Sequence, residues 1–111
     1  MFCGYTEARS IEIIIENDRV VATLKPVEVQ PMLAKKAVEY IEQRARPLAT
    51  GARQPFFLYV PLSTPHLPIV PAPEYVGKSG AKEYGDWILQ GDAVVGQILA
   101  ALDRNKLAAD T

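Results

Sequence analysis

The sequence has very little cysteine and histidine, with one residue of each, Cys3 and His66, in 111 residues. A single cysteine excludes an internal disulfide and a cysteine-based zinc site, although Cys3 could pair with another chain. A Ser-His-Asp triad would have to use His66, and no G-x-S-x-G elbow offers the nucleophile. The sequence therefore argues against a self-contained hydrolase.

Long apolar runs and an excess of one charge are also missing. Charge or proline soon interrupts every apolar stretch, whereas a membrane helix needs about 20 apolar residues. Twelve Lys and Arg against thirteen Asp and Glu give a net charge of -1, which argues against nucleic acid as a partner. Residues 1–7 have neither a basic leader nor an apolar stretch, so no secretory signal is expected and the localisation stays unknown.

The composition that remains, 49% hydrophobic and 23% charged, suits one globular domain. Two β-branched runs, residues 11–15 and 20–24, flank turn-forming residues at 16–19, which predicts a β-hairpin. Three isoleucines run together at residues 13–15, so the pattern leaves open whether one face of the hairpin is buried or both.

A helix is predicted from Pro31, which suits a first turn because its missing N–H costs nothing there. Pro47 and Gly51 end it, and Glu42 with Arg46 forms a favourable i,i+4 pair. Apolar residues recur at helical spacing along it, namely Leu33, Ala37, Val38 and Ile41.

Residues 56–60, FFLYV, are apolar without alternation and lie between Pro55 and Pro61. This pattern is typical of a central parallel strand that is buried on both faces. A helix followed by such a strand is half of the alternation that builds open parallel sheets, so the predicted fold class is α/β.

A second helix is predicted from Asp86, placed to cap it, to about Arg104. Gly91 and Gly96 inside it each cost about 1 kcal/mol relative to Ala, so a reason such as close backbone packing should exist, which the sequence alone does not show. Trp87 is expected in the core. The apolar stripe of this helix consists of Ile88, Val94, Val95, Ile98, Leu99 and Leu102.

His66 follows the predicted strand, in a cluster of prolines. Ligands of open α/β sheets bind beyond the carboxyl ends of the strands. Prolines on both sides restrict the backbone, and a positioned imidazole can donate to an anion or move a proton. The simpler alternative is that His66 only bonds a backbone carbonyl.

Several motifs resemble one family. PFFLYVPLSTPHLP at residues 55–68 is followed by GKSG at 77–80, YGD at 84–86 and DAVVG at 92–96. In this order they resemble the arylsulfatase-type sulfatases, and the resemblance extends over roughly residues 16–107.

The resemblance implies a partial parallel-sheet sandwich of the alkaline-phosphatase-like kind, with a hairpin, a helix, a buried strand, a Pro-rich loop and a helix. It implies hydrolysis of sulfate esters by a formylglycine nucleophile beside a calcium ion. His66 matches the family histidine that contacts the substrate sulfate and is the one expected catalytic residue. Such a donor strengthens as charge builds toward the leaving group.

The departures from the family pattern concern the nucleophile and the metal. Cys3 stands in CGYTE, which does not match the family's C-x-P-S-R or C-x-A-S-R. The family's metal-binding aspartates lie near the protein's start and in a D-N-G strand end expected after Thr111. We therefore expect no metal ligand in residues 1–111. These residues are expected to form a single partial sulfatase domain, an interior segment of a longer protein. Asp86 and Asp92 match positions of the family that are structural and do not belong to its calcium site. Lys78 and Lys82 are interpreted as solvated charges of the loop.

The expected function is that of a sulfatase fragment, a piece of a sulfuric ester hydrolase that is inactive alone and acts on a sulfate ester in the complete enzyme. A sheet cut at both sides exposes apolar edges, so self-association is expected. Two alternatives stay open. One is a phosphonate or phosphodiester hydrolase of the same superfamily, because a histidine beside an oxyanion does not distinguish sulfur from phosphorus, and the other is a non-catalytic truncated interaction domain. Family members often work outside the cytoplasm or in lysosomes.

Overall fold

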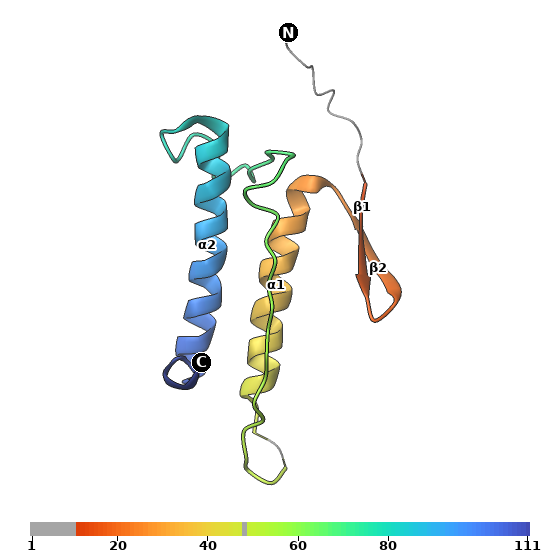
Figure 1. The fold of residues 1–111 in the computed structure, drawn as a ribbon, viewed down its shortest axis with the longest axis vertical. Coiled ribbons are helices and arrows are strands. Elements are labelled where there is room, and N and C mark those ends of the chain that lie inside the picture. Colours follow the sequence, from red (N-terminus) through yellow and green to blue (C-terminus); the bar gives the residue numbers. More distant parts are fainter. Residues whose placement is uncertain (1–10, 48) are drawn as a thin grey trace.

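The computed structural model describes residues 11–47 and 49–111, so Cys3 lies outside the described residues. Figure 1 shows two long helices side by side, with a two-stranded hairpin on the far side of the first helix. Neither described helix is long and apolar enough to cross a membrane. The elements in chain order are β1 (Glu12–Glu16), β2 (Arg19–Leu24), α1 (Pro26–Ala45), α2 (Lys82–Arg104) and the short 3-10 helix η1 (Ala108–Asp110).

The predicted hairpin is confirmed. β1 and β2 pair antiparallel from Glu12 opposite Leu24 to Glu16 opposite Arg19, with a bulge at residues 14–15. The turn residues at 17 and 18 have φ of 49° and 64°, the positive values that a tight two-residue hairpin turn requires. Ile13, Ile15, Val20 and Val21 are exposed. The paired residues Ile14 and Ala22 are half-buried, so one face of the hairpin is partly covered by the described chain.

Helix α1 begins at Pro26, earlier than predicted, because the carboxylate of Glu28 accepts the Lys25 N–H at 2.7 Å and completes the first turn. The prediction that Pro31 lies in the first turn is wrong, since Pro31 is inside the helix and Pro26 takes the first position. The helix ends at Ala45, just before Pro47, as predicted.

Helix α2 packs along α1, and its buried stripe forms the core with α1 and the chain end. The end of α2 at Arg104 is confirmed, but the helix starts at Lys82, so Asp86 lies in the second turn and does not cap it. Glu42 pairs with Arg104 of α2 at 3.5 Å, in place of the predicted Arg46 on its own helix. The buried cluster consists of Ile41, Ala101, Leu102 and Leu107.

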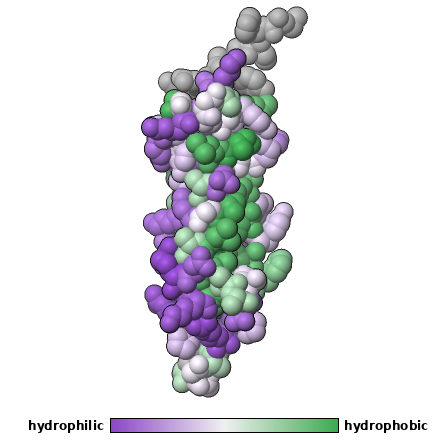
Figure 2. Space-filling model, turned by 90° about the vertical axis from the view of Figure 1, so that its left-hand side faces the viewer, coloured by the Kyte–Doolittle hydropathy of each residue, from purple (hydrophilic) through white to green (hydrophobic). Residues whose placement is uncertain are grey.

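The outer side of α2 carries an apolar band. Figure 2 shows hydrophobic surface running along this side of the molecule. Exposed side chains of α2 on its apolar stripe are Ile88, Val95 and Leu99. The helix therefore has two apolar faces, of which the described chain covers the one toward α1.

The prediction of a parallel strand at residues 56–60 is wrong, because these residues belong to no strand. They are extended and run back along α1, where the ring of Phe56 lies edge-on to Tyr40 at 5.7 Å (Figure 1). Burial alternates, and Phe57 and Tyr59 are 88% and 76% exposed. β1 and β2 form the sheet of the described residues and pair with each other, so this segment has no neighbouring strand.

Candidate functional site

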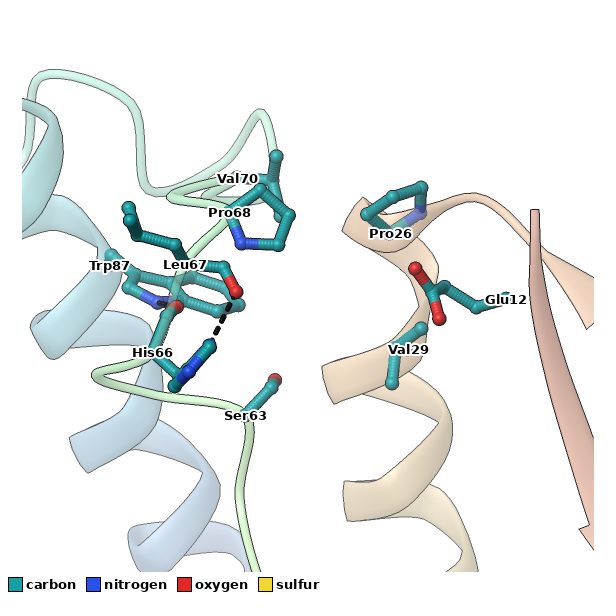
Figure 3. Close-up of a pocket in the computed structure, with 9 residues that line it drawn as sticks. All are labelled: Glu12, Pro26, Val29, Ser63, His66, Leu67, Pro68, Val70 and Trp87. Carbon is teal, nitrogen blue, oxygen red and sulfur yellow. Dashed lines mark hydrogen bonds between the residues drawn. The ribbon is translucent and has the colours of Figure 1, made fainter. Parts of the chain in front are cut away.

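His66 lies on the loop that follows the extended segment, between the first turns of α1 and the N-terminal half of α2. The backbone N–H of His66 donates to the Ser63 carbonyl at 2.9 Å, which closes a tight turn. Figure 3 shows His66 and Ser63 on one side of a pocket, with the start of α1 and β1 on the other. The pocket holds about 190 Å³, and its lining includes Pro26, Val29, Leu67, Pro68, Val70 and Trp87.

The imidazole of His66 is fixed by a single hydrogen bond. Its Nδ1 lies 2.6 Å from the carbonyl oxygen of Leu67 (Figure 3). A carbonyl oxygen only accepts, so Nδ1 carries the hydrogen and Nε2 is the other ring nitrogen left for a ligand. The simpler alternative, a histidine bonded to a backbone carbonyl, is thus confirmed for Nδ1. It leaves Nε2 on an exposed side chain that lines the pocket.

Gln30 of α1 holds the start of the loop. Its Oε1 accepts the Ser63 hydroxyl at 2.9 Å and the Thr64 backbone N–H at 3.3 Å. The side chain is fully buried, and its Nε2 has no partner among the described residues. A buried amide that accepts two hydrogen bonds in this way replaces the backbone partners that an irregular loop lacks.

Trp87 of α2 holds the middle of the loop. Its indole N–H donates to the His66 carbonyl at 3.2 Å, and the ring is buried as predicted. One helical turn later Gly91 faces Thr64, and a Cβ there would lie 2.5 Å from the Thr64 hydroxyl. Close packing against the loop is therefore the reason for a glycine at Gly91. It is not the reason at Gly96, where a Cβ would meet open space.

Asp86 and Gln90 of α2 hold the end of the loop. The Asp86 carboxylate accepts the backbone N–H groups of Gly77 at 2.7 Å and Ser79 at 2.9 Å, and Gln90 accepts that of Ala72 at 2.8 Å. The side chain and backbone N–H of Ser79, followed by the Gly77 N–H, lower the pKa of Asp86. Asp86 is therefore an ionised anchor for the turn.

The pocket does not fit a calcium ion. Among residues 11–47 and 49–111 no group of three or more His, Cys, Asp or Glu side chains could hold a metal, and calcium needs six to eight oxygen ligands. The ionisable residues of the lining are Glu12 and His66. Lys78 and Lys82 do not line it and are exposed, as is Asp92.

Two of the residues that position the loop were missed from the sequence. Gln30 and Gln90 are polar, and each lies in phase with buried residues of its helix, Gln30 with Ala34 and Ala37, and Gln90 with Trp87 and Val94. A polar residue inside an apolar helical stripe was the available signal, because burying an amide is costly unless it finds hydrogen-bond partners.

Comparison with known proteins finds sulfatases. The chain is 29% identical over 108 residues to human arylsulfatase H, which is 97% of this chain and 18% of that protein. It is 34% identical over 90 residues to N-acetylgalactosamine-6-O-sulfatase of Bacteroides thetaiotaomicron, covering 81% of this chain and 16% of that protein. Human arylsulfatase D is 32% identical over 80 residues, 72% of this chain and 12% of that protein.

The chain thus spans less than one fifth of the length of these curated relatives. No family model matches the chain. No solved structure matches it either.

Proposed function

We propose that this chain, which is related in sequence to the arylsulfatase-type sulfatases, forms one wall of the active site of a sulfate-ester hydrolase. In this proposal His66 contacts the sulfate group, and chain outside residues 1–111 supplies the nucleophile and the calcium ligands. The observation that carries it is the state of the His66 ring. Nδ1 is occupied by the Leu67 carbonyl, and Nε2 remains for a ligand of the pocket.

The fixed Nδ1 bond determines what His66 can do. A neutral ring with its hydrogen on Nδ1 presents a lone pair at Nε2, which repels an anion. A protonated ring keeps its bond to Leu67 and adds an Nε2–H that can donate to a sulfate oxygen, as a charge-assisted hydrogen bond. As the ester bond breaks, negative charge grows on the leaving oxygen, so the same group stabilises the transition state or delivers a proton.

Glu12 gives the pocket an opposing charge. Its carboxylate reaches the pocket from β1, on the side opposite His66 (Figure 3). An anion bound at His66 is attracted by the imidazolium and repelled by this carboxylate. Neutralising Glu12 as Glu12→Gln should therefore strengthen anion binding, whereas His66→Ala should abolish it.

Sulfate binding can be measured directly because the chain has one histidine and one tryptophan. We would titrate the 111-residue chain with inorganic sulfate and follow the ring signals of His66 and the indole N–H signal of Trp87 by NMR. The expected result is a saturable shift of both sets of signals. His66→Ala should remove the Trp87 shift, and Lys78→Ala, outside the pocket, should preserve it. A titration without any shift would contradict the proposal.

Hydrolysis tests the second half of the proposal, that the nucleophile lies outside this chain. A chromogenic aryl sulfate with calcium should show no turnover with the wild type or with His66→Ala. Turnover by the wild type that is lost in His66→Ala would mean that catalysis proceeds without the family nucleophile, and the proposed division of the site would be wrong.

A further inference from the structure

The hydrogen bonds around Gln30 fix the direction in which the Ser63 hydroxyl donates. The Thr64 backbone N–H can only donate, so the Gln30 atom that lies 3.3 Å from it is the amide oxygen and not the amide nitrogen. The Ser63 hydroxyl lies 2.9 Å from the same oxygen. Because an amide oxygen only accepts, the Ser63 hydroxyl donates its one hydrogen to Gln30. For a ligand it therefore has only lone pairs.

Ser63 presents these lone pairs on the same side of the pocket as His66. Its side chain is half-buried and lines the pocket, and Figure 3 shows it next to His66 on the loop, across from Glu12. The His66 N–H donates to the Ser63 carbonyl at 2.9 Å, which keeps the two residues in one turn. A ligand that reaches the His66 ring therefore enters the pocket into which the Ser63 oxygen faces.

The side chains of the pocket offer a ligand more acceptors than donors. Glu12 and Ser63 can only accept, and His66 donates through Nε2 when its ring is protonated. The indole N–H of Trp87 already donates to the His66 carbonyl. A sulfate group has only acceptor oxygens, so among these side chains it is complementary to His66 alone. Ser63 and Glu12 require hydrogen-bond donors on another part of the ligand.

We infer that Ser63 is a specificity-determining residue, whose hydroxyl oxygen accepts a hydrogen bond from a hydroxyl group on the alcohol part of the substrate. A sulfate ester has no donor on its sulfate group, so the donor comes from the alcohol. The substrate class is thus a sulfate ester of a polyhydroxylated alcohol, such as a sugar. Sites of this kind combine a few placed polar groups with apolar walls. The apolar residues of the lining are Pro26, Val29, Leu67, Pro68 and Val70.

This inference rests on the proposed function, because it requires the sulfate group at His66, and it adds a second contact that can be tested separately. Two sulfate esters of similar size serve as probes, glucose 6-sulfate and cyclohexylmethyl sulfate. Each joins a six-membered ring to sulfate through one CH2 group, and only the first carries hydroxyl groups. We would titrate the 111-residue chain with both esters and with inorganic sulfate, and follow the signals of His66 and Trp87 by NMR.

Ser63→Ala removes the acceptor oxygen. We expect it to weaken the binding of glucose 6-sulfate by about threefold to tenfold more than that of cyclohexylmethyl sulfate or inorganic sulfate, the effect of one neutral hydrogen bond. A displaced loop would weaken all three ligands alike, because all three use His66, so the difference between the probes isolates the bond to Ser63. Lys78→Ala, outside the pocket, is the control and should leave all three affinities unchanged.

The possible outcomes separate this inference from the proposed function. Equal losses for the two esters, or no loss for either, would overturn the role of Ser63 and leave sulfate binding at His66 intact. If none of the three ligands shifts the signals of His66 and Trp87, the proposed function and this inference both fail.

Far-UV circular dichroism checks that Ser63→Ala keeps α1 and α2. If the variant does not fold, the hydroxyl groups can be removed from the ligand instead, with deoxy forms of glucose 6-sulfate that each lack one of them. At least one deoxy form should bind the wild type about threefold to tenfold more weakly than the parent ester. Equal binding of all of them would overturn the inference.

Discussion

Two adjacent stretches of this chain, residues 55–61 and the loop at 63–80, are both free of helix and strand up to the start of α2, yet they are built differently. The first leaves its backbone unpaired and turns two aromatic rings to solvent. The second has its backbone held at successive points by side chains of α1 and α2.

The difference shows two ways of satisfying an irregular backbone. The loop uses amides, a carboxylate and an indole from α1 and α2, so its hydrogen-bond partners come from within the described chain. The segment at 55–61 can satisfy its five N–H groups only with water or with neighbouring strands. The loop that carries His66 is therefore held by the two helices of the described chain, whereas the segment before it is not.

Trp87 is the largest side chain that holds the loop, so its removal should leave the loop with less support from α2. Trp87→Ala deletes a fully buried ring and the bond to the His66 carbonyl, which we expect to lower the free energy of unfolding by about 3–5 kcal/mol or to prevent folding. Urea denaturation followed by circular dichroism measures it. Tyr59→Ala on the open segment is the control and should stay within about 0.5 kcal/mol of the wild type. Similar losses of unfolding free energy in the two variants would mean that the loop is not held more firmly than the segment before it.

Gln30→Met tests whether an amide acceptor is what holds the loop. The variant has a similar volume but leaves the Thr64 N–H and the Ser63 hydroxyl without an acceptor, so we expect a loss of about 1–3 kcal/mol. Hydrogen exchange of the Thr64 amide should accelerate more than that of amides in the core of α2. Unchanged protection of Thr64 would show that packing alone positions the loop.

The two glycines of α2 should respond with opposite signs. Gly91→Ala forces a methyl group against Thr64 and should destabilise the chain by about 1–3 kcal/mol, with the loop displaced. Gly96→Ala meets open space and should stabilise it by up to about 1 kcal/mol, through helix propensity. Thermal unfolding of both variants measures the contrast. Two stabilised variants would mean that the loop does not need its close approach to α2.

The smallest effect is expected from acid titration of Asp86. Its pKa lies below the ordinary value of 3.8, so its contribution to stability is complete above that value and is lost as the pH falls through the lower pKa of the folded chain. Asp86→Asn should therefore be less stable than the wild type at neutral pH, and the two unfolding curves should converge in acid. If the difference in stability between the wild type and Asp86→Asn is the same at every pH, the charge of Asp86 has no role in stability.

Local signals in the sequence predicted the hairpin and the ends of both helices, because Pro47 and the loss of apolar periodicity after Arg104 act within a few residues. The helix starts were placed too late, since Pro31 resembles a first-turn proline and Pro26 was given no weight. The strand at 56–60 failed for a different reason. A strand exists through its neighbours, and the described chain provides none there.

For the site, the sequence predicted that Trp87 is buried, and the structure confirms it. It placed His66 after a parallel strand buried on both faces, whereas the structure places it after an extended segment that belongs to no strand. It could not predict that Glu12 reaches the same pocket, because that depends on how the hairpin docks beside α1. Gln30 escaped notice because its role is set by partners in the loop, 33 residues away in sequence.

The bond between the Trp87 indole and the His66 carbonyl gives the molecule an optical readout of its own. The chain has a single tryptophan, so all indole emission originates from the side chain that holds the His66 backbone. A displacement of this loop should therefore register as a change in that emission, in the unlabelled native chain.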